Sequence, residues 1–410
     1  MTTIELTTTG VAAGGAAVGR EPGGRAVFVR GALPDERVRA RVVDEHRRFA
    51  HAELVEVVQS APGRRPAPCP HVAEGCGGCG WQHAQPSLQR ELRRRIVVDA
   101  LQRLGGVAEP AVALGRELPS EAFRTTARLA VRGGTAGFRR WHDHEPVAAT
   151  GCLVLHPLLQ ELVDDGCFGA ASQVTLRAGA RTGERLALLG PTAAGAVLPP
   201  DVVVVGMDEL RRGRRAWHHE EVAGRRWRIS ASSFFQTRPD GAEALVAEVQ
   251  DLVDGRGAGG GPASRRRATG TLVDLCAGVG LFAGTVGLAG TTAERHRVVA
   301  VERSRSAVAD ARVNLREVGA RIVRSSLERW AACPADVVVA DPARRGLGAA
   351  GVGAVAATGA PLVVLVSCDP ASLGRDAGLL LGAGYELDRV TAVDLFPHTP
   401  EVETVAAFRR

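Results

Sequence analysis

The sequence predicts an α/β protein with a small β-barrel in front, a mixed middle part and a doubly wound parallel sheet at the end. Three observations predict this. The 410 residues suffice for two to three domains. Short alternating runs separated by turns fill the first 62 residues, and short apolar runs alternate with helical stretches from residue 271 onward. Hydrophobic residues at 45% and charged residues at 23% exclude a disordered or collagen-like chain.

The first segment, residues 1–62, reads as all-β. Alternating runs at 25–29, 37–43 and 51–58 are separated by Gly, Pro and charged turns. A compact five-stranded barrel of the OB type fits this length. The pattern alone is equally compatible with a small β domain that has no binding role.

The middle segment, residues 63–225, begins with a Pro/Arg linker and a cysteine cluster. A helix is expected from Ser87, as its N-cap, to Leu104, because Leu88, Leu92 and Ile96 recur at helical spacing. Short strands with one or two helices are expected from about 120 to 225. The low-complexity stretch 255–270 predicts a flexible surface loop.

Three of the eight cysteines are clustered as Cys69-x6-Cys76-x2-Cys79, and Cys152 follows at a distance. A Cys-x2-Cys pair on a glycine turn can bring two thiolates to one metal centre, so the set can hold zinc or an iron–sulfur cluster. A thioredoxin-like redox pair at Cys76 and Cys79 is the rival interpretation, but it leaves Cys69 and Cys152 unexplained.

We find no export signal, since residues 1–10 lack a basic region and contain Glu5. A cytoplasmic protein is therefore expected, in which cysteines serve metals or catalysis rather than disulfides. The longest uncharged run, residues 346–368, contains Pro361 and many small residues. It is interpreted as a loop, a helix and a buried strand, with no membrane partner.

From residue 271 the expected strands are 272–275, 298–301, 336–340 and 362–366. In such sheets ligands bind at the carboxyl ends of the strands. Gly278 and Gly280 follow the first strand and Glu302 ends the second, which suits a nucleoside cofactor whose ribose hydroxyls bind an acid. Ala283 stands where a dinucleotide motif has its third glycine, so S-adenosylmethionine is favoured.

Two further residues carry chemistry at the end of the chain. Cys368 ends an apolar run and precedes Asp369-Pro370, a location that favours a nucleophile over a buried filler. Glu403 enters the last expected strand, where a glutamate is ordinarily a solvated edge residue.

The net charge of 51 − 45 = +6 permits an anionic partner. Arginine clusters are weak evidence here because the chain has no lysine.

Taken together, the motifs resemble those of the RNA uracil-C5 methyltransferase family, in particular its iron–sulfur branch that acts on 23S ribosomal RNA. The resemblance spans nearly the whole chain. Its motifs are the string Cys76–His83, Phe234-Phe235-Gln236, Asp341-Pro342-Ala343-Arg344, Ser367-Cys368-x-Pro370 and Phe396-Pro397-His398-Thr399-x-x-Val402-Glu403.

The resemblance implies an RNA-binding TRAM domain at 1–62, a central iron–sulfur α+β domain at 63–225 and a Rossmann-like class I methyltransferase domain at 226–410. Cys368 would be the nucleophile that adds to uracil C6, and Glu403 the general base. The implied partner is RNA, ribosomal rather than transfer RNA, with no protein partner. The residues implied to hold S-adenosylmethionine are Gln236, Cys276, Gly278, Gly280, Leu281, Glu302, Ser326 and Asp341; those implied to hold a 4Fe–4S cluster, with zinc as the lesser alternative, are Cys69, Cys76, Cys79 and Cys152.

The chain departs from the family pattern at a few positions, among them Leu281, Asp369 and Glu401. Other functions stay open beside the main one. A transfer RNA uridine-C5 methyltransferase would share the same motifs. A catalytically silent RNA-binding protein of this fold would lack cofactor binding. A cytosine-C5 methyltransferase would have Pro-Cys where Pro342-Ala343 stands. A cluster-dependent redox enzyme would show turnover linked to the cluster.

Overall fold

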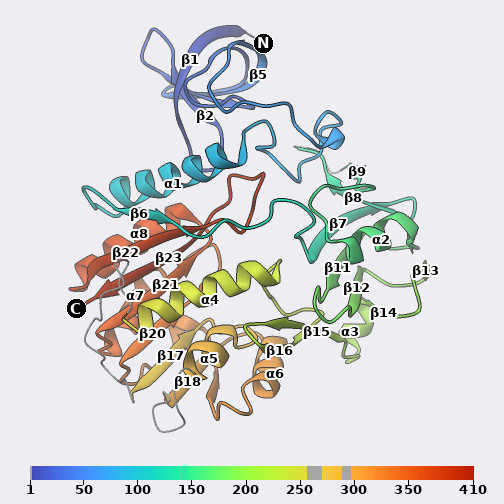
Figure 1. Ribbon diagram of the computed structural model, residues 1–410, viewed down its shortest axis with the longest axis vertical. Helices are drawn as coiled ribbons and strands as arrows, with labels where there is room; N and C mark the ends of the chain where they lie inside the picture. Colours follow the sequence, from blue (N-terminus) through green and yellow to red (C-terminus); the bar gives the residue numbers. More distant parts are fainter. Residues whose placement is uncertain (1, 142, 144, 256–269, 289–296) are drawn as a thin grey trace.

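The computed structural model describes residues 2–141, 143, 145–255, 270–288 and 297–410. The barrel lies at one end of the molecule, and helix α1 (Pro86–Arg103) runs between it and a large C-terminal sheet, as Figure 1 shows. A second sheet lies beside both. Most of the flexible loop predicted at 255–270 falls outside the described residues.

The N-terminal barrel closes as predicted, with the strand order β1-β2-β3-β5-β4. Alternate residues of each strand point inward, so Val27, Val29, Val38 and Ala52 fill a small apolar core. Closure pairs every strand on both sides and leaves no open edge. The strands are β1 (Thr3–Val11), β2 (Ala17–Arg20), β3 (Ala26–Arg30), β4 (Arg37–Glu45) and β5 (Phe49–Gln59).

The middle of the chain forms a six-stranded sheet in the order β14-β12-β11-β7-β8-β9, with helix α2 (Pro157–Asp165) packed against it. This matches the predicted mixture of short strands and one or two helices. Its strands are β7 (Thr126–Arg132), β8 (Thr135–Arg139), β9 (Pro146–Ala148), β11 (Gln173–Ala178), β12 (Arg185–Gly190) and β14 (Val202–Gly206); the other elements are η1 (Pro70–Val72), β10 (Cys167–Phe168), β13 (Ala196–Val197), α3 (Met207–Arg211), β15 (Trp217–Val222) and β16 (Arg225–Ser230).

Helix α1 begins one residue before the predicted N-cap. Ser87 lies inside the helix, Gln85 is the N-cap without a side-chain cap, and Pro86 occupies the first turn. The prediction of Ser87 was wrong because proline presets the helical φ and needs no partner for a backbone N–H at that position. The helix packs on α8 (Pro370–Gly382). The strand that follows, β6 (Val112–Leu114), pairs with β22 (Glu386–Val393) at the edge of the large sheet.

The large sheet has eight strands in the order β19-β18-β17-β20-β21-β23-β22-β6. Strands from β19 to β21 are parallel, as predicted, but β23 (Glu403–Arg409) is antiparallel to both of its neighbours. The connection from β22 to β23 is too short for the crossover that a parallel pair needs. The other strands are β17 (Thr271–Leu275), β18 (Arg297–Glu302), β19 (Arg321–Arg324), β20 (Val337–Ala340) and β21 (Leu362–Ser367).

Apolar residues cover both faces of this sheet, because successive strand residues point to opposite sides. Leu272 packs on the face covered by α4, α5 and α6, whereas Val273 packs on the face covered by α1, α7 and α8. In the part of the chain that the structure describes, no helix is long and apolar enough to cross a membrane. The remaining helices are α4 (Pro239–Val253), α5 (Leu281–Thr285), α6 (Arg305–Asn314), α7 (Gly348–Ala357), η2 (Val286–Leu288) and η3 (Leu327–Arg329).

Candidate active site and a cysteine-lined hollow

The strand register brings most of the predicted site residues to one edge of the large sheet. Leu275 pairs with both Val301 and Ala340, and Ala340 pairs with Leu365. The residues that follow these positions therefore leave the sheet side by side. They include Cys276, Glu302 and Asp341, with Cys368 one strand further on.

The turn after β17 holds one of these acids by backbone groups. Gly278 donates its N–H to Oε2 of Glu302 at 2.9 Å, and Ser304 donates to Oε1 at 2.6 Å. Each carboxylate oxygen keeps a further lone pair for a ligand. Gly280 has φ +100°, and a Cβ there would lie 2.9 Å from Leu315, so only glycine fits the turn. Leu281 follows as the buried first residue of α5.

Buried acids accumulate behind this turn. Asp274 is fully buried, with Oδ2 accepting from the N–H of Ala283 at 2.8 Å and Oδ1 left without a partner. Burial raises the pKa of Asp274 to about 8 and that of Asp341 to about 7, and it raises the pKa of the Cys276 thiol to about 12. A site of this kind favours a cationic ligand, since a positive charge would stabilise the ionised carboxylates.

Cys368, directly after β21, and Glu403, the first residue of β23, lie next to each other. Ser367 pairs with Thr404, whose Oγ1 donates to the Ser367 carbonyl at 2.9 Å, so the next residues on each strand are Cys368 and Glu403. Glu403 is 3% exposed, and burial raises its pKa well above the usual value, with a further contribution from Asp341. Burial, and then the Glu403 carboxylate, raise the pKa of the Cys368 thiol to about 12.

An arginine faces this pair from the turn after β20. The cation of Arg344 lowers the pKa of both Cys368 and Glu403, against the larger effect of burial. It also forms an ion pair with Glu401 at 3.4 Å. Asp369, a departure from the family pattern, caps α8 by accepting from the N–H of Ser372 at 2.7 Å. An aspartate at this position therefore stabilises the start of α8.

The last two predicted cofactor residues stand on other elements. Gln236 is buried in the segment between β16 and α4, next to Phe235, while Phe234 is 66% exposed. Ser326 is the N-cap residue of η3 after β19. The backbone N–H of Glu328, and then the Ser326 hydroxyl, donate to the exposed Glu328 carboxylate and lower its pKa.

Sequence reasoning missed two residues of α1 that hold the loop leading into β23. The buried guanidinium of Arg93 donates to the carbonyls of Thr399 and Phe396 at 3.1 and 3.2 Å, and it pairs with Asp394. Gln89 accepts from the His398 N–H at 2.7 Å. The available signal was two polar residues four apart on the apolar stripe of the helix.

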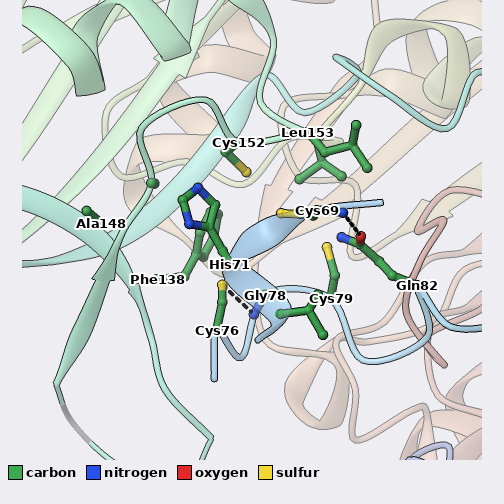
Figure 2. A pocket seen from close by; sticks show the side chains of 13 residues that line it. Cys69, His71, Cys76, Gly78, Cys79, Gln82, Phe138, Ala148, Cys152 and Leu153 are labelled. Atoms are coloured by element: carbon green, nitrogen blue, oxygen red, sulfur yellow. Dashed lines mark hydrogen bonds between the residues drawn. The ribbon is translucent and has the colours of Figure 1, made fainter. Parts of the chain in front are cut away.

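The four cysteines Cys69, Cys76, Cys79 and Cys152 line one hollow that is partly open to solvent. Figure 2 shows their sulfur atoms pointing into the same space. Gln82 accepts from the N–H of Cys69 at 3.0 Å, and Gly78 donates its N–H to Sγ of Cys76 at 3.5 Å. The more distant Cys152 is held by Gln160, which accepts its N–H at 2.9 Å.

The electrostatics of the hollow oppose free thiolates. Burial raises the pKa of Cys79 to about 11 and raises that of Cys152, where the N–H groups of Val154 and Leu155 act in the opposite direction. His71 also lines the hollow, but its Nε2 bonds the Thr150 carbonyl at 2.8 Å. Among the described residues, no group of three or more His, Cys, Asp or Glu side chains is arranged to hold a metal ion.

Comparison with known proteins extends these observations. Residues 2–55 match the TRAM domain family. The chain is 35% identical to an uncharacterized RNA methyltransferase of Streptomyces avermitilis, covering 97% of this chain and 95% of the relative. It is 32% identical to the 23S rRNA (uracil(1939)-C(5))-methyltransferase RlmD of Alkalilimnicola ehrlichii, over 94% of this chain and 92% of the relative.

A solved structure shares the fold over its whole length. The tRNA (uracil-54, C5)-methyltransferase of Pyrococcus abyssi, in complex with S-adenosyl-L-homocysteine, has a TM-score of 0.72, with 22% identity, 99% coverage of this chain and 100% of that chain. The fold and the sequence identity together define the class, an RNA methyltransferase with an N-terminal TRAM domain. The chain belongs to the RNA methyltransferase family that includes the 23S rRNA uracil-C5 methyltransferases.

Proposed function

We propose that this enzyme transfers a methyl group from S-adenosylmethionine to C5 of a uridine in RNA. The observation that carries the proposal is the pairing of Cys368 with Glu403 at the sheet edge. C5 of uracil is a poor nucleophile, so methylation needs covalent activation and a base. A thiol beside a buried carboxyl supplies both groups at one point.

The residues at the sheet edge suit the proposed cofactor. Its sulfonium is a cation that supplies an electrophilic methyl group, and the buried Asp274 with the half-buried Asp341 and Glu302 favours a positive charge. Glu302 would accept from the ribose hydroxyls through the lone pairs that Gly278 and Ser304 leave free. The other proposed contacts are Gln236, Cys276, Gly280, Leu281 and Ser326.

The proposed chemistry proceeds by addition and elimination. The Cys368 thiol gives its proton to solvent and its sulfur bonds to C6, which places negative charge on C5 and O4 of the ring. C5 then takes the methyl group. Glu403 removes the C5 proton, the C5–C6 double bond re-forms, and the sulfur leaves as thiolate. Arg344 favours the ionised forms of both residues, as its effect on their pKa values indicates.

RNA is the proposed partner, and ribosomal RNA is preferred because a 32% identical relative bears a 23S rRNA uracil-methyltransferase name. A transfer RNA substrate is the second candidate, favoured by the name of the structure with the same fold. The base must leave its stack to reach Cys368, at a cost of a few kcal/mol in paired RNA and less in a loop. We also propose that the reaction takes place in the cytoplasm.

For the cysteine hollow we propose a 4Fe–4S cluster held by Cys69, Cys76, Cys79 and Cys152, with zinc as the lesser alternative. The donor set fits, since four thiols meet in one hollow and backbone N–H groups point at Cys76 and Cys152. A cluster spreads its four ligands further apart than a single ion does. Because methyl transfer is redox-neutral, the proposed role is structural. It would order the domain proposed at residues 63–225, between those at 1–62 and 226–410.

The test is methylation in vitro with S-adenosylmethionine that carries a labelled methyl group. Purified enzyme is incubated with ribosomal RNA and, separately, with transfer RNA that lack the modification, and nucleosides are analysed by mass spectrometry. Label in 5-methyluridine supports the proposal, and the RNA that takes it identifies the substrate class. Label in 5-methylcytidine, or no label with intact RNA binding, would contradict it.

A further inference from the structure

The outer face of the barrel carries a cluster of rings that its own fold does not need. Val27, Val29, Ala50 and Ala52 point into the core, so Phe28 and Phe49 point outward together with His51. The barrel core, all of it within the described residues, contains no aromatic side chain. In a chain with 4% aromatic residues, both barrel phenylalanines are placed half-buried on the surface.

The rings contact one another. Phe28 and Phe49 meet edge to face with centroids 6.1 Å apart, and His46 stacks on Phe49 at 4.4 Å. His51 lies 5.4 Å from Phe28 and 5.5 Å from Phe49. We call Phe28, His46, Phe49 and His51 the ring cluster. Its flat apolar faces provide the kind of platform on which unpaired bases stack.

The platform continues toward the candidate active site. Arg30 is two residues beyond Phe28 on the same face of β3, and its guanidinium lies 3.7 Å from the centroid of the Trp141 ring. Gly80 lies close to both that ring and Pro400, since a Cβ at Gly80 would be 3.7 Å from the ring and 3.9 Å from Pro400. Pro400 belongs to the loop that leads into Glu403.

Charge beside the ring cluster has both signs, since the Asp44 carboxylate lies 2.9 Å from Nε2 of His46 and exposed arginines follow in the next turn. Arg37 and Arg39 face Glu5, and Arg41 forms an ion pair with Glu53 at 3.0 Å, so carboxylates neutralise these three. The exposed Arg47 and Arg48, in the turn next to His46 and Phe49, have no carboxylate partner among the described residues. Rings with free cations next to them match the bases and phosphates of RNA rather than a protein surface.

We propose that the ring cluster, Arg30 and Trp141 form a stacking track for an unpaired stretch of the substrate RNA, which runs from the barrel to the loop of Pro400. The proposal rests on the proposed function, because it names the state of the RNA that the enzyme recognises. In this proposal the rings bind unpaired RNA of any sequence, and the site of Cys368 selects the base that reacts.

The test compares binding of a labelled single-stranded RNA of about 20 nucleotides with binding of the same RNA in a duplex. The double variant Phe28→Leu with Phe49→Leu keeps apolar packing but removes the stacking faces. Its Kd for the single strand should rise about 10- to 100-fold, with an unchanged salt slope, because stacking is worth about 1–3 kcal/mol per base. Val43→Ala, an exposed apolar residue on the same barrel, is the matched control and should bind like the wild type.

Arg47→Ala with Arg48→Ala should act differently, lowering the salt slope by about 0.7 for each RNA phosphate that the variant no longer neutralises. Wild-type affinity of the leucine variant would overturn the proposal and leave the rings to another partner, and so would equal losses for single strand and duplex. Binding needs no methyl transfer, so these outcomes stay readable even if uracil methylation fails. A methylating enzyme whose leucine variant binds normally would overturn this inference alone.

Discussion

Reactive groups are positioned in two different ways at the sheet edge and in the cysteine hollow. At the edge, Glu302, Asp341 and Cys368 stand at the ends of buried parallel strands whose register fixes their heights. In the hollow, Cys69, Cys76, Cys79 and Cys152 come from irregular segments held by the side chains of Gln82 and Gln160. The difference teaches that the fold preorganises the edge through strand register, whereas the geometry of the hollow would depend on the cluster proposed to bind its four thiols.

The largest effect is expected from removing the Cys368 thiol at the sheet edge. Cys368→Ala should lower the methylation rate by at least about 10⁴-fold, since alanine has no nucleophile that can add to C6 of the uracil ring. Its melting temperature should stay close to that of the wild type because the residue follows a fully formed strand. Cys167→Ala, which removes an exposed cysteine elsewhere, is the control and should keep full activity.

Glu403→Gln tests the second member of the pair. The amide cannot take the C5 proton, so turnover should fall by about 10²- to 10⁴-fold. The adduct with RNA should then accumulate and appear as a shifted band on a denaturing gel. A variant that turns over normally without such a band would contradict the assignment of Glu403 as the base.

In the hollow, Cys152→Ala should act on stability more than on chemistry. Loss of one ligand should remove the absorbance at about 400 nm from protein purified without oxygen, and destabilise the fold by roughly 4 kcal/mol. Thermal melting and the spectrum check both effects, with Cys167→Ala again as the matched control. Full absorbance in Cys152→Ala would show that this residue holds no cluster.

A smaller effect is expected from pH and from Arg344. Because burial raises the pKa values of Cys368 and Glu403, both are protonated at low pH, so kcat/KM should rise as pH rises through neutrality. Arg344→Ala removes a cation that lowers both values, so the profile should move to higher pH and the rate at neutral pH should fall about tenfold. An unchanged pH profile of kcat/KM would show that Arg344 does not act on Cys368 and Glu403.

The same contrast explains what the sequence could and could not predict. Strands such as 272–275 and 362–366 were predictable because their apolar runs end at polar residues. Since the carboxyl ends of parallel strands meet at one edge of a sheet, the same pattern predicted that Glu302, Asp341 and Cys368 lie at that edge. The pairing of β6 with β22 and the clamp of Gln89 and Arg93 on the β22–β23 loop were not predictable. They join residues about 280 to 309 positions apart, and local periodicity carries no information on such contacts.

The barrel shows a further limit. From the sequence alone, Arg37, Arg39 and Arg41 of the barrel are candidate RNA contacts, and that role is a prediction. The register of β1, β4 and β5 places carboxylates within 4.0 Å of all three, a fact that depends on strand pairing and not on the residues themselves. The outward direction of Phe28 likewise follows from closure of the barrel.

The most direct test uses RNA in which 5-fluorouridine replaces uridine. Fluorine at C5 cannot be removed as the proton is, so the proposed bond between Cys368 and C6 should persist after methyl transfer. Digestion and mass spectrometry should then find the methylated fluoropyrimidine on the peptide that contains Cys368, in amounts that approach one per enzyme. An enzyme that methylates uridine yet forms no such adduct, or forms it on a different cysteine, would contradict the covalent mechanism.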